Sequence, residues 1–297
     1  MENLIIPANY RSELNLYETQ EAISTIKQFF QQALSEQLTL LRVTAPLFVT
    51  PESGLNDNLN GVERPVSFDM LAIEDSNIEI VHSLAKWKRE ALGKYEFPVH
   101  TGLYTDMNAI RRDEELDNLH SIYVDQWDWE KVIEAKDRNT QVLHHHVQLI
   151  YQSLLNTEYI VCEHYPIIQP FLPKEIGFIT SEQLLLRYPH LSAKERENAI
   201  AKEMGAVFIQ GIGNVLSDGQ AHDHRAPDYD DWTLNGDLLY WCDTLNCAIE
   251  LSSMGIRVDE EAMRRQLAIR GCEERAELPF HKALLADELP LTIGGGI

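Results

Sequence analysis

The segment SIYVDQWDWEK, residues Ser121–Lys131, predicts a β-strand with an unusual polar face. Because strand side chains point alternately to opposite faces, Gln126, Asp128 and Glu130 would share one face. Asp125 and the two tryptophans would share the other. Two interpretations follow: an exposed edge strand whose polar face is hydrated, or a sheet that lines a polar cavity.

The neighbouring segments predict an α+β fold. Helical apolar spacing and capping-box patterns predict helices at 17–36, at 141–155, after Thr180, after Ser192, at 259–270 and at 278–287, with one more inside IEIVHSLAKWKREALGKYE. Runs rich in branched and aromatic residues predict the strands LTLLRVTAP, IEIV, GLYTDMNAI, SIYVDQWDW, AVFIQGIG, DLLYWCD and CAIELSSMG. Because the strands run consecutively, we expect a mostly antiparallel central sheet flanked by helices.

Bulk composition narrows the classes of function. No repeat, low-complexity tract or Gly/Ser linker divides the chain, so we expect one domain spanning residues 1–297. The 25 basic residues against 47 acidic ones give a net charge of −22, which argues against nucleic-acid and anionic-membrane partners. No run approaches the ~18 apolar residues of a membrane span. The four cysteines form no CxxC pair, so we expect reduced thiols in the cytoplasm.

Two short motifs suggest sites that their geometry or spacing argues against. His144–His146 would lie on a helix, where successive side chains diverge by about 100° and cannot converge on one ion. GIGNVLSDG carries Leu216 where the third glycine of a dinucleotide motif belongs. The sequence also contains no phosphate-binding GxxxxGK[ST] loop and no GxSxG nucleophile motif.

Charged residues near the predicted strands form a more informative pattern. Arg111 and Glu114 follow a strand directly, and Lys88 lies in the basic helical turn of HSLAKWKRE. Glu250 lies inside an apolar strand segment, so we expect a buried carboxylate that needs a metal ion or a hydrogen-bond donor. Such groups could bind an anion through magnesium and arginine, an amine through carboxylates, or a zwitterion and a nucleotide together.

Several longer motifs resemble one known family. VHSLAKWKR, LHSIYVDQWDWE, RAPDYDDW, LNGD and ELSSMGIRVD are similar to segments of the ammonia-dependent asparagine synthetases, or aspartate–ammonia ligases. The resemblance covers essentially the whole chain and implies the catalytic fold of class II aminoacyl-tRNA synthetases. LTLLRVTAP is similar to the first class II motif, which implies a homodimer, and IRRDE is similar to the second.

The resemblance also implies a reaction and a set of site residues. Aspartate would attack the α-phosphate of ATP, and ammonia would convert the resulting β-aspartyl-adenylate to asparagine and AMP. The implied catalytic residues are Arg111, Asp57, Gln126, Asp128 and Asp230. The implied aspartate or asparagine contacts are Ser83, Lys88, Arg111, Gln126, Ser253 and Gly255. The implied ATP contacts are Arg111, Glu114, Ser121, Val124, Asp237 and Glu250, of which Asp237 and Glu250 would hold Mg²⁺.

The sequence departs from the family pattern at two places. The resemblance implies further residues before LNGD and after LPLTIGGGI, and the three glycines predict a flexible end with no packed element. Two rivals therefore stay open. One is a regulatory paralogue that binds an amino acid or nucleotide with little catalysis. The other is a fragment of an aspartyl- or asparaginyl-tRNA synthetase, which the acidic charge disfavours.

Overall fold

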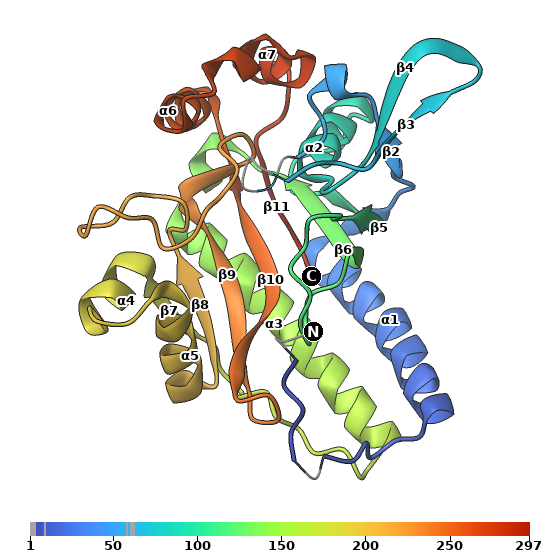
Figure 1. Ribbon diagram of the computed structural model, residues 1–297, viewed down its shortest axis with the longest axis vertical. Helices are drawn as coiled ribbons and strands as arrows, with labels where there is room; N and C mark the ends of the chain where they lie inside the picture. The colour runs from blue at the N-terminus through green and yellow to red at the C-terminus, as the bar shows by residue number, and fades with distance from the viewer. Residues whose placement is uncertain (1–3, 9, 58, 60–62) are drawn as a thin grey trace.

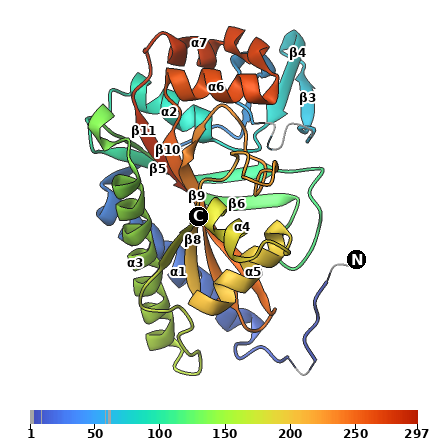
Figure 2. The same cartoon turned by 90° about the vertical axis from the view of Figure 1, so that its left-hand side faces the viewer.

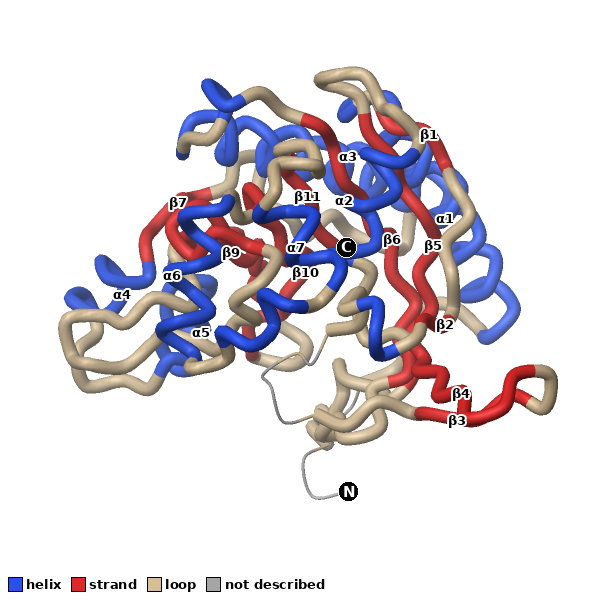
Figure 3. The backbone as a smooth tube through the Cα atoms, turned by 90° about the horizontal axis from the view of Figure 1, so that it is seen from above, coloured by secondary structure: helices blue, strands red, loops and turns tan. Residues whose placement is uncertain are grey.

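The computed structural model describes residues 4–8, 10–57, 59 and 63–297 and is built around one large sheet (Figure 1). The strands of this sheet are, in spatial order, β1 (Leu40–Arg42), β5 (Gly102–Ile110), β6 (Tyr123–Val132), β11 (Thr292–Gly296), β10 (Cys247–Arg257), β9 (Asp230–Cys242), β8 (Ala206–Gln210) and β7 (Gly177–Thr180). A smaller sheet contains β2 (Phe48–Val49), β4 (Ile73–Ile80) and β3 (Ser67–Met70). The β3–β4 hairpin projects from the body of the molecule (Figure 3).

The large sheet is mixed. The two outermost pairs, β1 with β5 and β7 with β8, are parallel. All neighbouring strands from β5 through β6, β11, β10 and β9 to β8 pair antiparallel. The prediction of a mostly antiparallel sheet is therefore corrected at its two edges. Helices lie between β1 and β5 and between β7 and β8 in the sequence, and such crossover connections permit parallel pairing.

Helices cover both faces of this sheet (Figure 2). The α-helices are α1 (Leu16–Leu38), α2 (Ala85–Lys94), α3 (Thr140–His164), α4 (Ser181–Arg187), α5 (Ala193–Met204), α6 (Glu260–Arg270) and α7 (Pro279–Leu285). Short 3₁₀ helices are η1 (Pro51–Ser53), η2 (Ala135–Asp137) and η3 (Glu273–Glu277). One core lies between the sheet and α1 with α3, and a second core lies between the opposite face and α4 with α5.

The helix predictions hold where local signals were strong. α1 extends the predicted helix 17–36 by one or two residues at each end. The capping boxes of Thr180 with Gln183 and of Ser192 with Glu195 are formed at the starts of α4 and α5. α3 continues to His164, well beyond the predicted end at 155, and β9 begins at Asp230 rather than at 237. Element boundaries are thus less well predicted than the elements themselves.

The two faces of β6 divide as the alternation predicts. The Trp127 ring lies 4.7 Å from the Phe30 ring of α1, and the buried Trp129 ring stacks on His146 of α3 at 6.3 Å. Truncating a fully buried tryptophan typically costs about 3–5 kcal/mol. The aromatic face of β6 therefore holds the sheet to α1 and α3, which leaves the polar face of the strand on the other side.

The glycine-rich end of the sequence is a central strand, so the prediction of a flexible, unpacked end is wrong. β11 pairs with both β6 and β10, and Thr292 and Ile293 are fully buried. A Cβ atom on Gly294 would lie 2.1 Å from Glu130 Oε2, and one on Gly296 would lie 1.5 Å from Gln126 Nε2. The glycines thus leave room for the polar side chains of β6.

Candidate functional site

The open part of the sheet borders a polar cleft of about 700 Å³. β6, β10 and β11 contribute to its lining, as do the loop after β5, the start of α2 and the segment 223–230. Most of the predicted site residues line it, namely Asp57, Ser83, Lys88, Arg111, Glu114, Ser121, Val124, Gln126, Asp128, Asp230, Glu250 and Ser253. β6 is an interior strand, so the structure favours the polar-cavity interpretation over a hydrated edge strand.

Lys88 of α2 forms part of the cleft floor. Its side chain is fully buried, and Nζ donates to Asp128 Oδ1 and to the carbonyl oxygens of Trp129 (3.0 Å) and Gly295 (3.1 Å). Burial lowers the pKa of Lys88 well below its usual value, and the like charge of Arg257 adds to this effect. Three acceptors take up the three donors of the ammonium form, so the nitrogen is fixed in the cleft floor.

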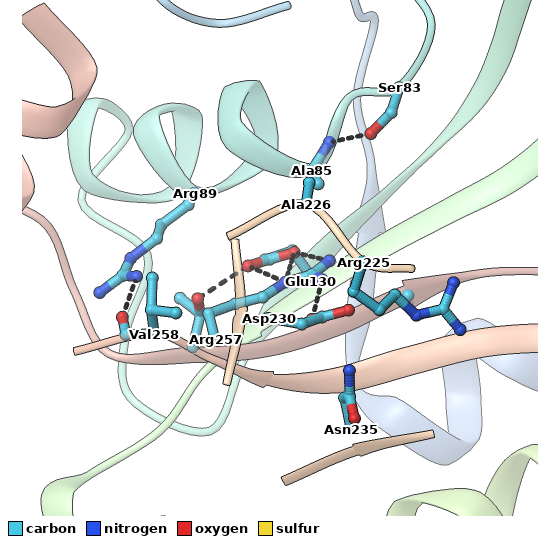
Figure 4. Close-up of polar contacts among 12 residues, drawn as sticks. Ser83, Ala85, Arg89, Glu130, Arg225, Ala226, Asp230, Asn235, Arg257 and Val258 are labelled. Atoms are coloured by element: carbon cyan, nitrogen blue, oxygen red, sulfur yellow. Dashed lines mark hydrogen bonds and ion pairs between the residues drawn. The ribbon is translucent and has the colours of Figure 1, made fainter. Parts of the chain in front are cut away.

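Arg257 organises the rest of the floor (Figure 4). Its Nε and Nη2 donate to Glu130 Oε2 at 3.0 and 2.7 Å, and its Nη1 donates to Asp230 Oδ1 at 2.5 Å. Thr292 of β11 donates to Glu130 Oε1 at 2.7 Å. Burial alone would raise the pKa of Glu130, but Arg257 and Lys88 hold it below its ordinary value. Glu130 is therefore ionised at neutral pH and serves to hold the cations in place.

Asp57 and Arg111 form a wall of the cleft in which the hydrogen-bonding groups are less completely paired than on the floor. Asp57 is buried, and its Oδ1 accepts from Leu59 N at 3.0 Å, but its Oδ2 has no hydrogen-bond partner among the described residues. Burial raises the pKa of Asp57 to about 6, although Lys86 opposes the shift. Arg111 Nη2 has one long contact, 3.4 Å to the His82 carbonyl, and within the described chain its buried Nε has no partner.

Glu250 is exposed, so the prediction of a buried carboxylate at this position is wrong. Strand alternation and a register shift after Glu250 place Leu251 in the core while Glu250 faces the cleft. Asp237 is the buried acid instead, and it accepts a hydrogen bond from Arg225 Nη2. Burial raises the pKa of Asp237 despite Arg225, and the charge of Glu250 adds to the increase. The two acids thus lie close enough to influence each other.

Gly255 lies behind the cleft rather than in its lining. A Cβ atom there would come within 2.8 Å of both Asp230 Oδ1 and Asn235 Cβ. Glycine therefore lets the Asp230 carboxylate lie directly against β10. The contact of Gly255 with substrate stays a prediction, and the structure shows that this residue makes space for Asp230.

Three cleft-lining cations were missed from the sequence, Arg257, Arg225 and Lys194. Arg257 had a usable signal, because it stands between Ile256 and Val258 in an apolar run, where a buried charge needs a partner. Arg225 had no such signal, because it lies among other charged residues outside any regular element.

The histidine run does not form a metal site. Within His144–His146, His144 Nε2 lies 2.8 Å from Gln210 Oε1, while His146 Nδ1 lies 2.8 Å from the Val142 carbonyl. The described residues contain one group of at least three side chains with metal-ligand spacing, and it lies outside the cleft lining: His100, Glu134 and Asp137.

Comparison with known proteins identifies the family. Residues 17–297 match the family model of aspartate-ammonia ligase. This chain belongs to the aspartate–ammonia ligase family. A curated aspartate–ammonia ligase from Clostridium perfringens (strain SM101 / Type A) is 61% identical over 297 residues, covering 100% of this chain and 88% of the relative. The ligase from Clostridium tetani (strain Massachusetts / E88) is 58% identical over 296 residues, covering 100% and 87%.

Solved structures of the same fold include tRNA synthetases. Asparaginyl-tRNA synthetase from Pyrococcus horikoshii, complexed with asparaginyl-adenylate, superposes with a TM-score of 0.66 at 13% identity, covering 94% of this ligase-family chain and 64% of that chain. The Entamoeba histolytica asparaginyl-tRNA synthetase gives 0.65 at 10% identity, covering 97% and 67%. At such identities the likeness shows the fold alone, and it confirms the predicted class II synthetase-like core.

The predicted family and enzyme class are thus confirmed. Neither rival is favoured, because relatives at 55–61% identity are named aspartate–ammonia ligases, whereas the synthetase structures share 10–14% of their residues. None of the helices in the described part of this family member combines the length and hydropathy that crossing a bilayer requires.

Proposed function

We propose that this chain makes asparagine from aspartate, ammonia and ATP, releasing AMP and pyrophosphate. The observation that carries the proposal is 61% identity over all 297 residues to an aspartate–ammonia ligase. The chemistry of the cleft supports it, because the lining offers cations for anionic reactants and carboxylates for an amine.

The proposed reaction has two steps. A free carboxylate is a poor acyl donor, because its leaving group would be an oxide. In the first step a side-chain carboxylate oxygen of aspartate attacks the α-phosphorus of ATP, the α–β anhydride bond breaks, and pyrophosphate leaves. In the second step the ammonia nitrogen attacks the β-aspartyl carbonyl carbon, and AMP leaves with the bonding electrons. The first step joins two anions, so the site must supply positive charge at the reacting phosphate.

Arg111 is the proposed source of that charge. Its guanidinium borders the cleft, and its unpartnered Nε shows that the described residues do not use its full donor capacity. The planar guanidinium of an arginine can donate two parallel hydrogen bonds to the α-phosphate or to the substrate carboxylate. A lysine ammonium could not bridge these two groups in the same way. Glu114, Ser121 and Val124 lie in the same part of the lining and are the proposed contacts for the rest of the nucleotide.

The cleft floor is the proposed aspartate site. Lys88 and Ser83, which both line the cleft near the start of α2, would contact a substrate carboxylate, and that carboxylate would replace one of the acceptors that Lys88 Nζ has in the structure. Gln126, Asp128 and Asp230 would surround the amino group, because their oxygens line the same floor. Ser253 would contact the substrate from β10.

Asp57 is the proposed proton acceptor. Ammonia is mostly ammonium at neutral pH, so a proton must leave before the nitrogen can attack. Burial places the pKa of Asp57 near 6, and its Oδ2 has no partner in the described chain, so this carboxylate can accept a proton near neutrality.

Asp237 and Glu250 would hold the magnesium ion of the nucleotide. Carboxylate oxygens are the ligands that Mg²⁺ prefers, and the mutual influence of these two acids fits a shared cation. The ion would supply neutralising charge to the phosphates when bound.

A homodimer is also part of the proposal. It rests on the resemblance of LTLLRVTAP to the first class II motif. In the structure this segment contains the edge strand β1, in which Leu41 is 63% exposed. Size-exclusion chromatography with light scattering would give the mass of the assembly directly.

An assay for AMP with purified protein tests the function. AMP and asparagine should form in equal amounts when aspartate, ATP, Mg²⁺ and ammonium are all present, and omission of ammonium should abolish asparagine. Glutamine in place of ammonium should give little product, and added tRNA should change nothing. Ligand binding without AMP would instead favour the regulatory rival, and tRNA-dependent product would favour a synthetase fragment.

A further inference from the structure

Arg225 makes a single, unusual ion pair in the cleft. Its Nη2 donates to Oδ1 of Asp237, and the two side chains are 14% and 7% exposed. Glu250 also attracts the Arg225 guanidinium electrostatically. Lys194 attracts Glu250 as well, so Arg225 balances Asp237 directly and shares the charge of Glu250 with Lys194.

The bonding of Arg225 is incomplete in comparison with that of Arg257. Arg257 uses Nε, Nη1 and Nη2 on the carboxylates of Glu130 and Asp230. Arg225 bonds Asp237 through Nη2 alone, and its buried Nε has no partner among the described residues. A guanidinium committed permanently to a carboxylate usually forms a two-pronged pair, so Arg225 retains donors for another acceptor.

The segment that carries Arg225 has contacts that do not involve its guanidinium. Arg270 donates to the Arg225 carbonyl at 3.3 Å. Three residues further on, buried Asp228 accepts from Lys86 at 3.2 Å and lies 3.0 Å from His281 Nε2. Figure 4 shows the Arg225 side chain extending away from Asp230 and the rest of the floor network. The guanidinium can therefore change partners without moving the segment that carries it.

We propose that Arg225 is an exchangeable counter-ion, which binds Asp237 when no metal is present and transfers to nucleotide phosphate when a divalent cation takes the Asp237–Glu250 pair. This inference rests on the proposed function of that acid pair. A guanidinium and a metal ion at the same carboxylate repel each other, so each weakens the binding of the other. Phosphate oxygens would then accept hydrogen bonds from the guanidinium that the carboxylate has released.

Manganese binding to the nucleotide-free protein tests the exchange, with Mn²⁺ measured by electron paramagnetic resonance. Arg225→Gln should bind Mn²⁺ at least about fivefold more tightly than the unmodified protein, the lower end of typical coupling between two ligands. Arg225→Lys keeps the competing charge and should stay within about twofold of the unmodified protein. Arg264→Gln removes the same charge from an exposed i,i+4 pair on α6 and should change nothing.

ATP binding gives the second readout. With Mn²⁺ saturating, Arg225→Gln should bind ATP at least about fivefold more weakly, because the released guanidinium is no longer available to the phosphates. Unchanged or weaker Mn²⁺ binding in Arg225→Gln would overturn the exchange, as would unchanged ATP binding.

A further variant separates failure of the exchange from failure of the function. Asp237→Asn should weaken Mn²⁺ binding. If it does not, the acid pair holds no metal, and the inference is wrong even when the protein makes asparagine. If Asp237→Asn behaves as expected but no asparagine forms in the AMP assay, the proposed function fails by itself.

Discussion

The floor and the wall of the cleft carry similar charges in opposite states of pairing. On the floor, Glu130 is buried among Arg257, Lys88 and Thr292, all within hydrogen-bond or ion-pair distance. On the wall, Arg111 and Asp57 each keep a buried polar atom with no partner in the described chain. Buried polar atoms are normally satisfied, so the unpaired ones on the wall mark where a ligand is expected. The difference separates charges whose hydrogen bonds are already made within the protein, and which hold the floor of the proposed aspartate site in place, from charges that still have donors or acceptors for a reactant.

The largest expected effect comes from breaking the floor. Arg257→Met should lower the free energy of unfolding by about 3–5 kcal/mol, because Glu130 and Asp230 would be left buried without their main counter-ion. Urea unfolding at neutral pH measures the change. Arg264→Gln, which loses only an exposed pair, serves as the control. A loss for Arg257→Met as small as that of the control would mean that the floor is not structural.

The wall should show the reverse profile. Arg111→Ala should lower the rate of aspartate-dependent ATP–pyrophosphate exchange by about a hundredfold or more, since a donor to the developing charge is lost. Its free energy of unfolding should change by less than about 1 kcal/mol, because Arg111 makes only a 3.4 Å contact with the described residues. Near-normal exchange would remove Arg111 from the chemistry, and a large stability loss would move it to the structural set.

Asp57 sharpens the comparison through pH. Its pKa is about 6 in the folded chain and near 3.8 when exposed, so between these values the native state binds more protons than the unfolded state. The free energy of unfolding therefore falls as pH rises through this window, by about 3 kcal/mol because one pKa unit corresponds to about 1.36 kcal/mol, and Asp57 changes it no further above the window. Asp57→Asn cannot ionise, so the variant does not lose this stability as the pH rises. In urea unfolding from about pH 4 to about pH 8, the free energy of unfolding of the variant should rise relative to that of the unmodified protein up to about pH 6. A pH-independent difference would contradict this assignment.

An exposed ion pair should have the smallest effect. Lys27 of α1 and Asp125 of β6 pair at 2.5 Å, with side chains 45% and 37% exposed. Lys27→Ala should cost about 0.2–1 kcal/mol and should shrink further at high salt. Thermal unfolding at low and high ionic strength checks both points. A cost that equals that of Arg257→Met would show that burial is not what distinguishes the floor.

Local patterns predicted the helices and strands well but not which of their residues are buried. The alternation in SIYVDQWDWEK correctly separated Trp127 and Trp129 from Gln126 and Asp128, because that alternation is a property of the extended backbone itself. The same reasoning misjudged Glu250, whose apolar neighbour packs on the other face. Burial of one strand residue depends on which face is covered, and covering elements lie far away in sequence.

The sequence by itself determined the presence of the helices, the capping boxes that start α4 and α5, the two faces of β6 and, through its longer motifs, the family. Only the tertiary structure decided that the glycine-rich end is a central strand, where Gly294 pairs with Glu130. It alone also decided that Arg257 completes the floor and that Arg225 pairs with Asp237. The physical reason is that caps and alternation act within a few residues of backbone. Strand pairing and buried ion pairs join residues that the sequence keeps far apart, as Arg257 and Glu130 show.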